Sequence, residues 1–136
     1  PLNGGKQPYS QRNLLRKIIS DADSCIALPH PGATLRYGHD TMVMPLTCLM
    51  DLDGMGMQVS DLEQLAYKGW NNYRIFPMAC NIQLVFYHKK GSKDILVKVL
   101  RNENEATLPI KTDIAPYYHW KDVRQYYLDK LNKFTE

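Results

Sequence analysis

One short stretch of the chain places an imidazole directly next to a carboxylate. His39 and Asp40 follow Gly38, and the pattern predicts a short strand over Ala33–Tyr37 that turns at this glycine into a helix. A glycine lets the backbone turn sharply or approach a ligand closely because it has no Cβ. Ligands bind at such strand-to-helix junctions in open α/β sheets, and the first backbone N–H groups of a helix attract anions. The combination suits phosphate chemistry.

The same residues also fit a purely structural role. Asp40 would then be the N-cap of the following helix, and His39 a structural side chain beside it. Arg36, which precedes Gly38 by two positions, also has one structural and one functional interpretation. It forms a buried ion pair, since buried charges are normally paired, or it contacts a phosphate.

Composition and charge describe an ordinary folded domain. The chain has 136 residues, of which 44% are hydrophobic and 23% are charged, so we expect residues 1–136 to be a single domain or a fragment of one. The net charge of +3 comes from scattered basic residues, which argues against nucleic acid binding. No apolar run reaches the ~18 residues of a membrane span. The chain begins at Pro1 without a signal-peptide pattern, and we expect a segment of something longer or a processed product.

Cysteines and histidines are not spaced as metal ligands. The three cysteines form no C-x-x-C pair, and we expect small buried hydrophobic side chains, with one disulfide and one free thiol as the alternative, at Cys25, Cys48 and Cys80. The four histidines share no ligand spacing, so we predict no metal, and no cofactor is indicated. His119 is predicted to belong to the start of the last helix rather than to a site.

Hydrophobic periodicity predicts two long helices and a hairpin. A helix from Ser10 has an apolar face suited to covering a sheet, made of Leu14, Leu15, Ile18, Ile19 and Ala22. Residues 81–88 and 95–100 alternate as the two strands of an antiparallel hairpin around a charged loop. The C-terminal helix has an apolar stripe of Trp120, Val123, Tyr127, Leu131 and Phe134.

Three further elements are predicted with less regular patterns. Residues 42–52 form a helix with Pro45 in its first turn, where a proline costs little. Ser60 and Glu63 match a capping box that opens a short helix, and residues 107–110 form a short strand. The aromatic stretch 69–73 either lines a cleft or packs on the surface. The order of all elements predicts an α/β fold, a mixed sheet with one parallel crossover, an antiparallel hairpin and flanking helices.

Residues 35–41, Leu-Arg-Tyr-Gly-His-Asp-Thr, resemble the C-terminal signature of the histidine phosphatase superfamily, in the branch of acid phosphatases and phytases. The preceding apolar helix and the hairpin resemble the same branch, in particular bacterial relatives of multiple inositol polyphosphate phosphatase. The resemblance covers nearly the whole chain. It implies the C-terminal part of a three-layer αβα fold and an enzyme that is secreted or periplasmic.

The resemblance also implies a two-step hydrolysis of phosphomonoesters, such as inositol polyphosphates or phytate. A histidine in an Arg-His-Gly-x-Arg motif attacks phosphorus and becomes phosphohistidine. His39 would then hold the phosphate, Asp40 would protonate the leaving oxygen, and Thr41 and Arg36 would contact the substrate. Such an Asp must hold its proton until it is needed, which favours either an acidic operating pH or a raised pKa of that Asp. Phosphoryl transfer depends mostly on positioning and on neutralising oxygen charge, so these roles are chemically consistent.

Two departures from the family pattern limit this interpretation. The chain contains no Arg-His-Gly, so the nucleophile is absent, and Met42 stands where many acid phosphatases have Asn after His-Asp-Thr. We therefore predict that the chain is the C-terminal part of an enzyme and that it is inactive alone. Its expected partner is the missing N-terminal part of the same enzyme. If a separate chain supplies that part, a large apolar face should be exposed. The alternative is a non-catalytic anion- or protein-binding module with a degenerate phosphatase fold.

Overall fold

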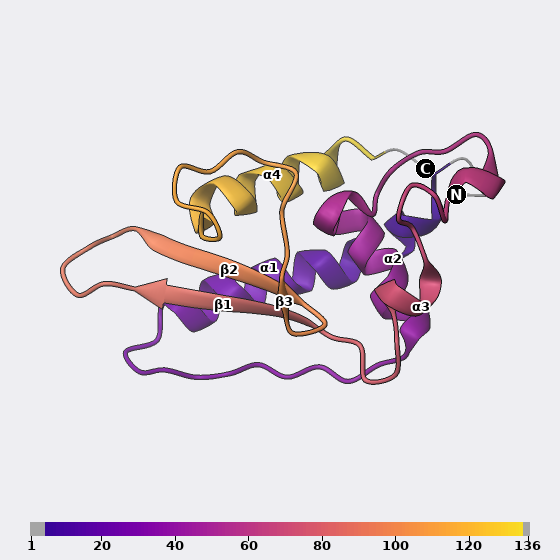
Figure 1. The fold of residues 1–136 in the computed structure, drawn as a ribbon. Coiled ribbons are helices and arrows are strands. Elements are labelled where there is room, and N and C mark those ends of the chain that lie inside the picture. The colour runs from indigo at the N-terminus through magenta and orange to yellow at the C-terminus, as the bar shows by residue number, and fades with distance from the viewer. Residues whose placement is uncertain (1–4, 135–136) are drawn as a thin grey trace.

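A β-hairpin and three longer helices make up the fold, and Figure 1 shows their arrangement. The computed structural model describes residues 5–134. The hairpin consists of β1 (Ile82–His88) and β2 (Ile95–Arg101), paired antiparallel with Leu84 opposite Val99. β2 also pairs antiparallel with two short strands, β3 (Asn104–Glu105) and β4 (Tyr118–His119). The predicted α/β class, with an antiparallel hairpin and helices, is confirmed.

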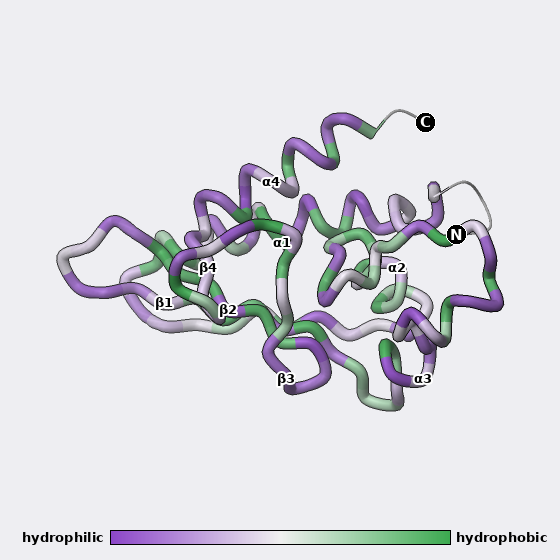
Figure 2. The backbone as a smooth tube through the Cα atoms, turned by 45° about the horizontal axis from the view of Figure 1, so that its top comes forward, coloured by the Kyte–Doolittle hydropathy of each residue, from purple (hydrophilic) through white to green (hydrophobic). Residues whose placement is uncertain are grey.

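Alternation along the hairpin places one face of each strand against the helices. Val97 and Val99 of β2 are fully buried, and the Phe86 ring of β1 meets Trp120 edge-on with the ring centroids 5.0 Å apart. Figure 2 shows apolar residues along β2 and α2, whereas the tip of the hairpin is hydrophilic. The predicted strand limits agree with the structure to within one residue at each end.

The first and last long helices bury the faces that their periodicity predicts. α1 (Arg12–Ile26), preceded by the 3-10 helix η1 (Gln7–Gln11), buries Leu15, Ile19 and Ala22. α4 (Trp120–Asn132) buries Trp120, Val123, Tyr127 and Leu131. Asp23 of α1 joins the two helices, because its carboxylate accepts hydrogen bonds from Trp120 Nε1 at 3.0 Å and Arg124 Nε at 2.7 Å.

The helix that follows the Gly-His-Asp stretch is α2 (Asp40–Met50). It starts two residues earlier than predicted, so Pro45 lies in its second turn instead of its first. α4 contacts the C-terminal end of α2. There the Tyr127 hydroxyl donates a hydrogen bond to Met50 O at 2.7 Å, and Lys130 Nζ donates to Leu49 O at 2.6 Å. These carbonyls have no partner within the helix, so α4 fixes the position of α2.

Short irregular elements connect α2 to the hairpin. They are η2 (Leu52–Gly54), η3 (Leu62–Gln64) and α3 (Asn72–Ile75). The capping box predicted at Ser60 is wrong by one residue, because Asp61 is the N-cap and accepts from Glu63 N. The helix that it opens is a single 3-10 turn. Among the described residues, no helix is long and apolar enough to cross a bilayer.

Two predicted strands are not formed. Residues 107–110 are irregular after the short strand β3, and residues 33–37 lie outside the sheet. Every strand pair in the part of the chain that the structure describes is antiparallel, so the predicted parallel crossover is also absent there. A strand needs a neighbour that accepts and donates backbone hydrogen bonds. The stretch 33–37 has no such neighbour, and Figure 1 shows it running along the border of the molecule.

The cysteines are less buried than predicted. Cys25, Cys48 and Cys80 are all free thiols, and each is partly exposed. Burial raises the pKa of the Cys48 thiol, so it stays protonated near neutral pH. Neither full burial nor a disulfide describes them.

Candidate functional site

His39 and Asp40 lie side by side where α2 begins. His39 is the N-cap residue, with an extended backbone (φ −107°, ψ 164°), and its carbonyl accepts from Met42 N at 2.9 Å. Asp40 is the first residue of the helix, and its Oδ1 accepts from Thr41 N at 2.9 Å. The N-cap role suggested for Asp40 therefore belongs to His39, while the carboxylate occupies the first turn, where the helix dipole favours negative charge.

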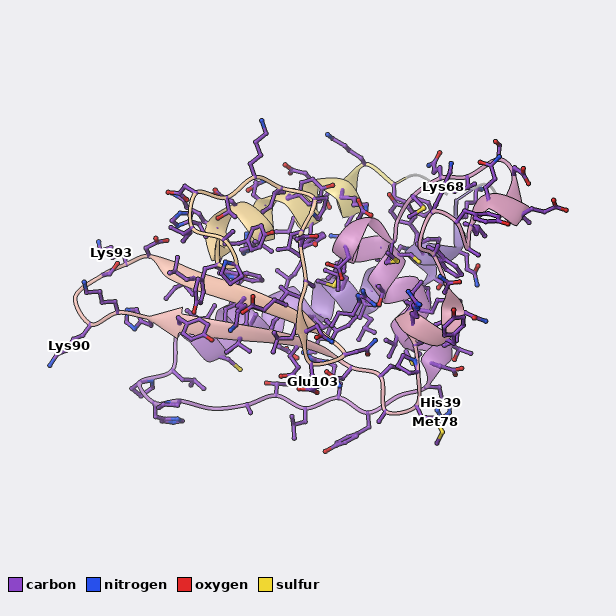
Figure 3. The ribbon with its side chains drawn as sticks, in the orientation of Figure 1. His39, Lys68, Met78, Lys90, Lys93 and Glu103 are labelled. Atoms are coloured by element: carbon purple, nitrogen blue, oxygen red, sulfur yellow. The ribbon has the colours of Figure 1, made fainter. Side chains whose placement is uncertain are left out.

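Both side chains are exposed and line a pocket of about 260 Å³. One wall comes from the start of α2 and the other from the loop after α3; together the walls are Gly38, His39, Asp40, Val43, Phe76, Pro77, Met78, Ala79 and Cys80. Figure 3 shows His39 next to Met78. The sequence indicates the first wall as a candidate site and gives no indication of the second.

The second wall is a tight loop. Cys80 N donates to Pro77 O at 3.0 Å, and Ala79 has a left-handed backbone (φ 59°), which is uncommon for a residue with a Cβ. Met78 stands at its tip and is 99% exposed. Pro77 was the available sequence signal, since proline marks turns, but a turn signal does not say which other segment the turn faces.

The aromatic stretch 69–73 does not line this pocket. Trp70 donates its indole Nε1–H to Met55 O at 3.1 Å, which holds the ring against the loop after η2. Tyr73 is largely exposed. The surface-packing interpretation of this stretch therefore describes it better than the cleft-lining one.

Cys80 is the side chain of the second wall whose pKa is influenced by Asp40. The pKa of its thiol is raised, first by burial and then by the Asp40 carboxylate. A raised pKa keeps the sulfur protonated, and a protonated thiol is a poor nucleophile. Cys80 is therefore a neutral wall residue of the pocket.

The other two predicted site residues lie outside the pocket lining. Arg36 forms an ion pair with Asp21 of α1, as one of its two interpretations predicts. The pair is partly exposed, whereas a buried pair was predicted. Thr41 follows Asp40 in the helix and is exposed. No group of three His, Cys, Asp or Glu residues within residues 5–134 is arranged to hold a metal ion.

This arrangement supplies some of what phosphoryl transfer requires. A phosphate monoester carries negative oxygens that need hydrogen-bond donors and positive charge. Among the residues that line the pocket, His39 is the one that can become a cation, and Asp40 can carry a proton. The remaining walls are mostly apolar. The pocket thus offers one side chain of a type that binds anions and one of a type that donates protons.

No family model matches the chain. A curated relative, multiple inositol polyphosphate phosphatase 1 of Gallus gallus, is 26% identical over 122 residues, which is 86% of this chain and 27% of the relative. The chain thus spans about a quarter of the length of that relative. The similarity is distant, and it supports the histidine phosphatase superfamily and no finer assignment.

Proposed function

We propose that the chain contributes part of the active site of a histidine-type phosphomonoesterase, with His39 as the phosphate-binding residue and Asp40 as the proton donor. The observation that carries the proposal is the pair itself. An exposed imidazole and an exposed carboxylate share one pocket at a helix start, in a chain distantly similar to an inositol polyphosphate phosphatase.

His39 has the simpler of the two roles. As an imidazolium it donates a charge-assisted hydrogen bond to a phosphate oxygen, and the start of α2 adds a favourable dipole. Thr41 is proposed to bind phosphate from the first turn of the same helix. Arg36 stays a proposed substrate ligand, and in that role it exchanges its ion pair with Asp21 for a substrate oxygen.

Asp40 acts on the leaving group. When the bond between phosphorus and the ester oxygen breaks, the carboxylic acid gives its proton to that oxygen, so an alkoxide does not have to leave unprotonated. In the second step, the carboxylate takes a proton from the water that attacks phosphohistidine. The nucleophilic histidine is proposed to lie in an Arg-His-Gly segment outside residues 1–136. Inositol polyphosphates or phytate are the proposed substrates, and the periplasm or the cell exterior is the proposed location.

One observation favours a second candidate. His39 is the single basic side chain among the pocket's lining residues, and the other walls are largely apolar. Such a pocket also suits a module that binds anions or proteins without hydrolysing phosphate. Turnover of a phosphomonoester distinguishes the two candidate functions, because only the phosphatase hydrolyses it.

The test uses the polypeptide made from the complete reading frame that contains these residues. Asp40→Asn should lower kcat for phytate on the order of 100-fold or more. The loss should be much smaller for p-nitrophenyl phosphate, whose leaving group departs readily without a proton. Asp122→Asn is a matched control, because Asp122 is an exposed aspartate in the first turn of α4. Equal losses for both substrates would remove Asp40 from the proton-donor role.

Two further measurements complete the test. His39→Ala should raise KM and lower kcat, since the phosphate loses a ligand in both the ground state and the transition state. The isolated 136-residue chain should show no turnover. Turnover by the isolated chain that disappears in Asp40→Asn would contradict the proposal that the nucleophile lies elsewhere. Phosphate binding without turnover by the complete polypeptide would favour the non-catalytic module.

A further inference from the structure

We infer that the loop of residues 76–80 is the specificity-determining wall of the pocket, that Met78 contacts the alcohol part of the substrate through apolar atoms, and that Asn102 positions the loop. This assignment rests on the proposed function, because it takes His39 as the phosphate ligand and Asp40 as the proton donor to the ester oxygen. It adds the residues that recognise the carbon side of that oxygen.

The side chains of this wall carry no charge. Four of the five residues in the loop have apolar side chains, namely Phe76, Pro77, Met78 and Ala79, and all four line the pocket. The fifth, Cys80, is a protonated thiol. A phosphate group placed against these side chains loses water and gains no side-chain donor, whereas a carbon skeleton gains by leaving water. The chemistry of the wall therefore fits the carbon atoms of the alcohol and not a second phosphate group.

The pocket has room for a phosphate group and the nearest atoms of its alcohol. Its volume is about 260 Å³, just below the ~300–1,000 Å³ of most small-molecule sites. Figure 3 shows His39 and Met78 next to each other. An ester bound at His39 and Asp40 therefore has its first alcohol carbons beside Met78. In an inositol polyphosphate these are C–H groups of the ring, and the neighbouring phosphates have to point out of the pocket.

Met78 is held in a position that is unfavourable without a ligand. Its apolar side chain is 99% exposed, and the next residue, Ala79, has a left-handed backbone (φ 59°). Strained residues of this kind cluster at ligand sites, where the surrounding structure holds them in place. The unbranched thioether chain of methionine also adapts to ligands of different shapes. Both features suit a residue that contacts the variable part of a substrate.

Asn102 joins the two ends of the loop. Its side-chain amide donates to Arg74 O at 3.3 Å and to Ile75 O at 3.0 Å, directly before the loop. Its Oδ1 accepts from Asn81 N at 3.0 Å, directly after the loop, and Asn102 N donates to Asn81 O at 3.0 Å. One side chain thus fixes the separation of the ends between which the wall is built. Asn102 does not line the pocket itself, so it acts as a positioning residue.

Two alkyl phosphates test the contact at Met78 in the polypeptide made from the complete reading frame. Benzyl phosphate has an apolar alcohol and glycerol 2-phosphate has a polar one, and both alcohols need a proton to leave. The ratio of their kcat/KM values therefore reports on the wall and not on Asp40. Met78→Ala should lower kcat/KM for benzyl phosphate on the order of 10-fold and for glycerol 2-phosphate less than about 2-fold. An unchanged ratio would overturn the inference.

Met78→Lys tests the missing charge of the wall. The added ammonium group should raise kcat/KM for phytate by about 3-fold or more, because a neighbouring phosphate gains a partner, and should lower it for benzyl phosphate. Leu62→Lys is the control, because Leu62 is 48% exposed, lies outside the pocket lining and gains the same charge. Equal changes in the two lysine variants would show that the net charge of the protein sets the preference, and the inference would be wrong.

Asn102→Gly and Asn102→Asp test the positioning role. Both residues tolerate the left-handed backbone at this position (φ 49°), and both remove the donors to Arg74 O and Ile75 O. Either variant should reduce the preference for benzyl phosphate, as Met78→Ala does, whereas a general loss of stability lowers both activities equally. Combined with Met78→Ala, neither should reduce the ratio further, because both act through the same contact. Equal losses for the two esters would leave Asn102 with a structural role alone.

The assignment of the wall and the proposed function fail in different ways. If Asp40→Asn lowers turnover of both esters, but Met78→Ala lowers the Tm of the complete polypeptide and leaves the ratio unchanged, Met78 packs against other parts of that polypeptide. The assignment of the wall is then wrong and the proposed function stands. If the complete polypeptide hydrolyses none of these phosphomonoesters, both are wrong.

Discussion

Asp53 Oδ2 lies 2.8 Å from Arg101 Nε, and this ion pair joins the turn after α2 to the end of β2. The other carboxylate oxygen accepts from Thr107 N at 2.9 Å, and Asp53 N donates to Thr107 O at 2.9 Å. One residue with a left-handed backbone (φ 53°) thus connects the turn after α2 with Arg101 and Thr107, which are 48 and 54 residues away in the sequence. α2 carries the candidate site, so this connection helps to fix its position on the sheet.

Removing the Asp53 side chain should be costly. Asp53→Ala should lower the free energy of unfolding by about 2–3 kcal/mol. The substitution removes the acceptor of Arg101 and Thr107, and alanine has no side-chain hydrogen bonds to offset the strained left-handed backbone. Asp53→Asn keeps an acceptor for Thr107 and tolerates the left-handed conformation, so it should cost about 1 kcal/mol. Urea unfolding of both variants checks the order. Lys17→Ala is the control, because it removes an exposed ion pair to Asp21 and should cost under about 0.5 kcal/mol. Equal costs for Ala and Asn would show that the charge alone matters.

Tyr127 should contribute to stability through its hydroxyl. Its ring is buried and its hydroxyl donates to Met50 O, one of the last carbonyls of α2. Tyr127→Phe should lower the free energy of unfolding by about 1–2 kcal/mol, because a buried carbonyl loses its donor. Tyr67→Phe should be neutral, since Tyr67 is exposed. Thermal unfolding followed by circular dichroism measures both. A Tyr127→Phe variant as stable as the wild type would mean that water replaces the hydroxyl.

Gly56 should not tolerate a methyl group. A Cβ at this position would stand 2.7 Å from Cys48 O and 2.8 Å from Asp51 Oδ1, where the Gly56 N–H also donates to the same carboxylate oxygen. Gly56→Ala should therefore cost about 1–3 kcal/mol through steric overlap. Gly32→Ala is the matched control, because nothing lies within 4 Å of a Cβ there. Chemical denaturation of the two variants gives the difference, and similar midpoints would show that the loop relaxes freely.

His119 should make stability depend on pH. Its Nδ1 lies 2.8 Å from Asp94 Oδ2 and its Nε2 lies 3.1 Å from Asp113 Oδ1, so the imidazolium bridges two carboxylates. The pKa of His119 is raised above its usual value of 6.5, first by the hydrogen bond to Asp113 and then by that to Asp94. The contribution of the bridge is thus fully present below pH 6.5 and disappears as the pH rises through the raised pKa.

The comparison is between the wild type and His119→Gln in denaturant at two pH values. The wild type should be the more stable protein at pH ~5.5, and its advantage should shrink towards pH ~8.5. His30→Gln, which alters an exposed loop histidine, should show no such trend. The pKa of Asp113 is lowered, first by its hydrogen bond to His119, so its own contribution is lost only under strongly acidic conditions. An advantage independent of pH would mean that the charge of the imidazole is unimportant.

The helices and the hairpin could be predicted because their patterns are local. Leu15 and Ile19 share a helix face by their spacing of four, and alternation fixes which side of β2 carries Val97 and Val99. The position of Asp40 at a helix start was also readable, since glycine and an acidic residue before an apolar run are local signals. Such features depend on residues within one or two turns of each other.

The rest depended on contacts between distant residues. The strand predicted over residues 33–37 does not form, because a strand requires a hydrogen-bonded neighbour and these residues have none in the described part of the chain. The loop around Met78 faces His39 only because α3 and α2 pack together. By itself the sequence determined which residues could do chemistry and where the long helices and the hairpin form. Only the tertiary structure decided which walls surround those residues, because packing between distant segments leaves no periodic mark on either one.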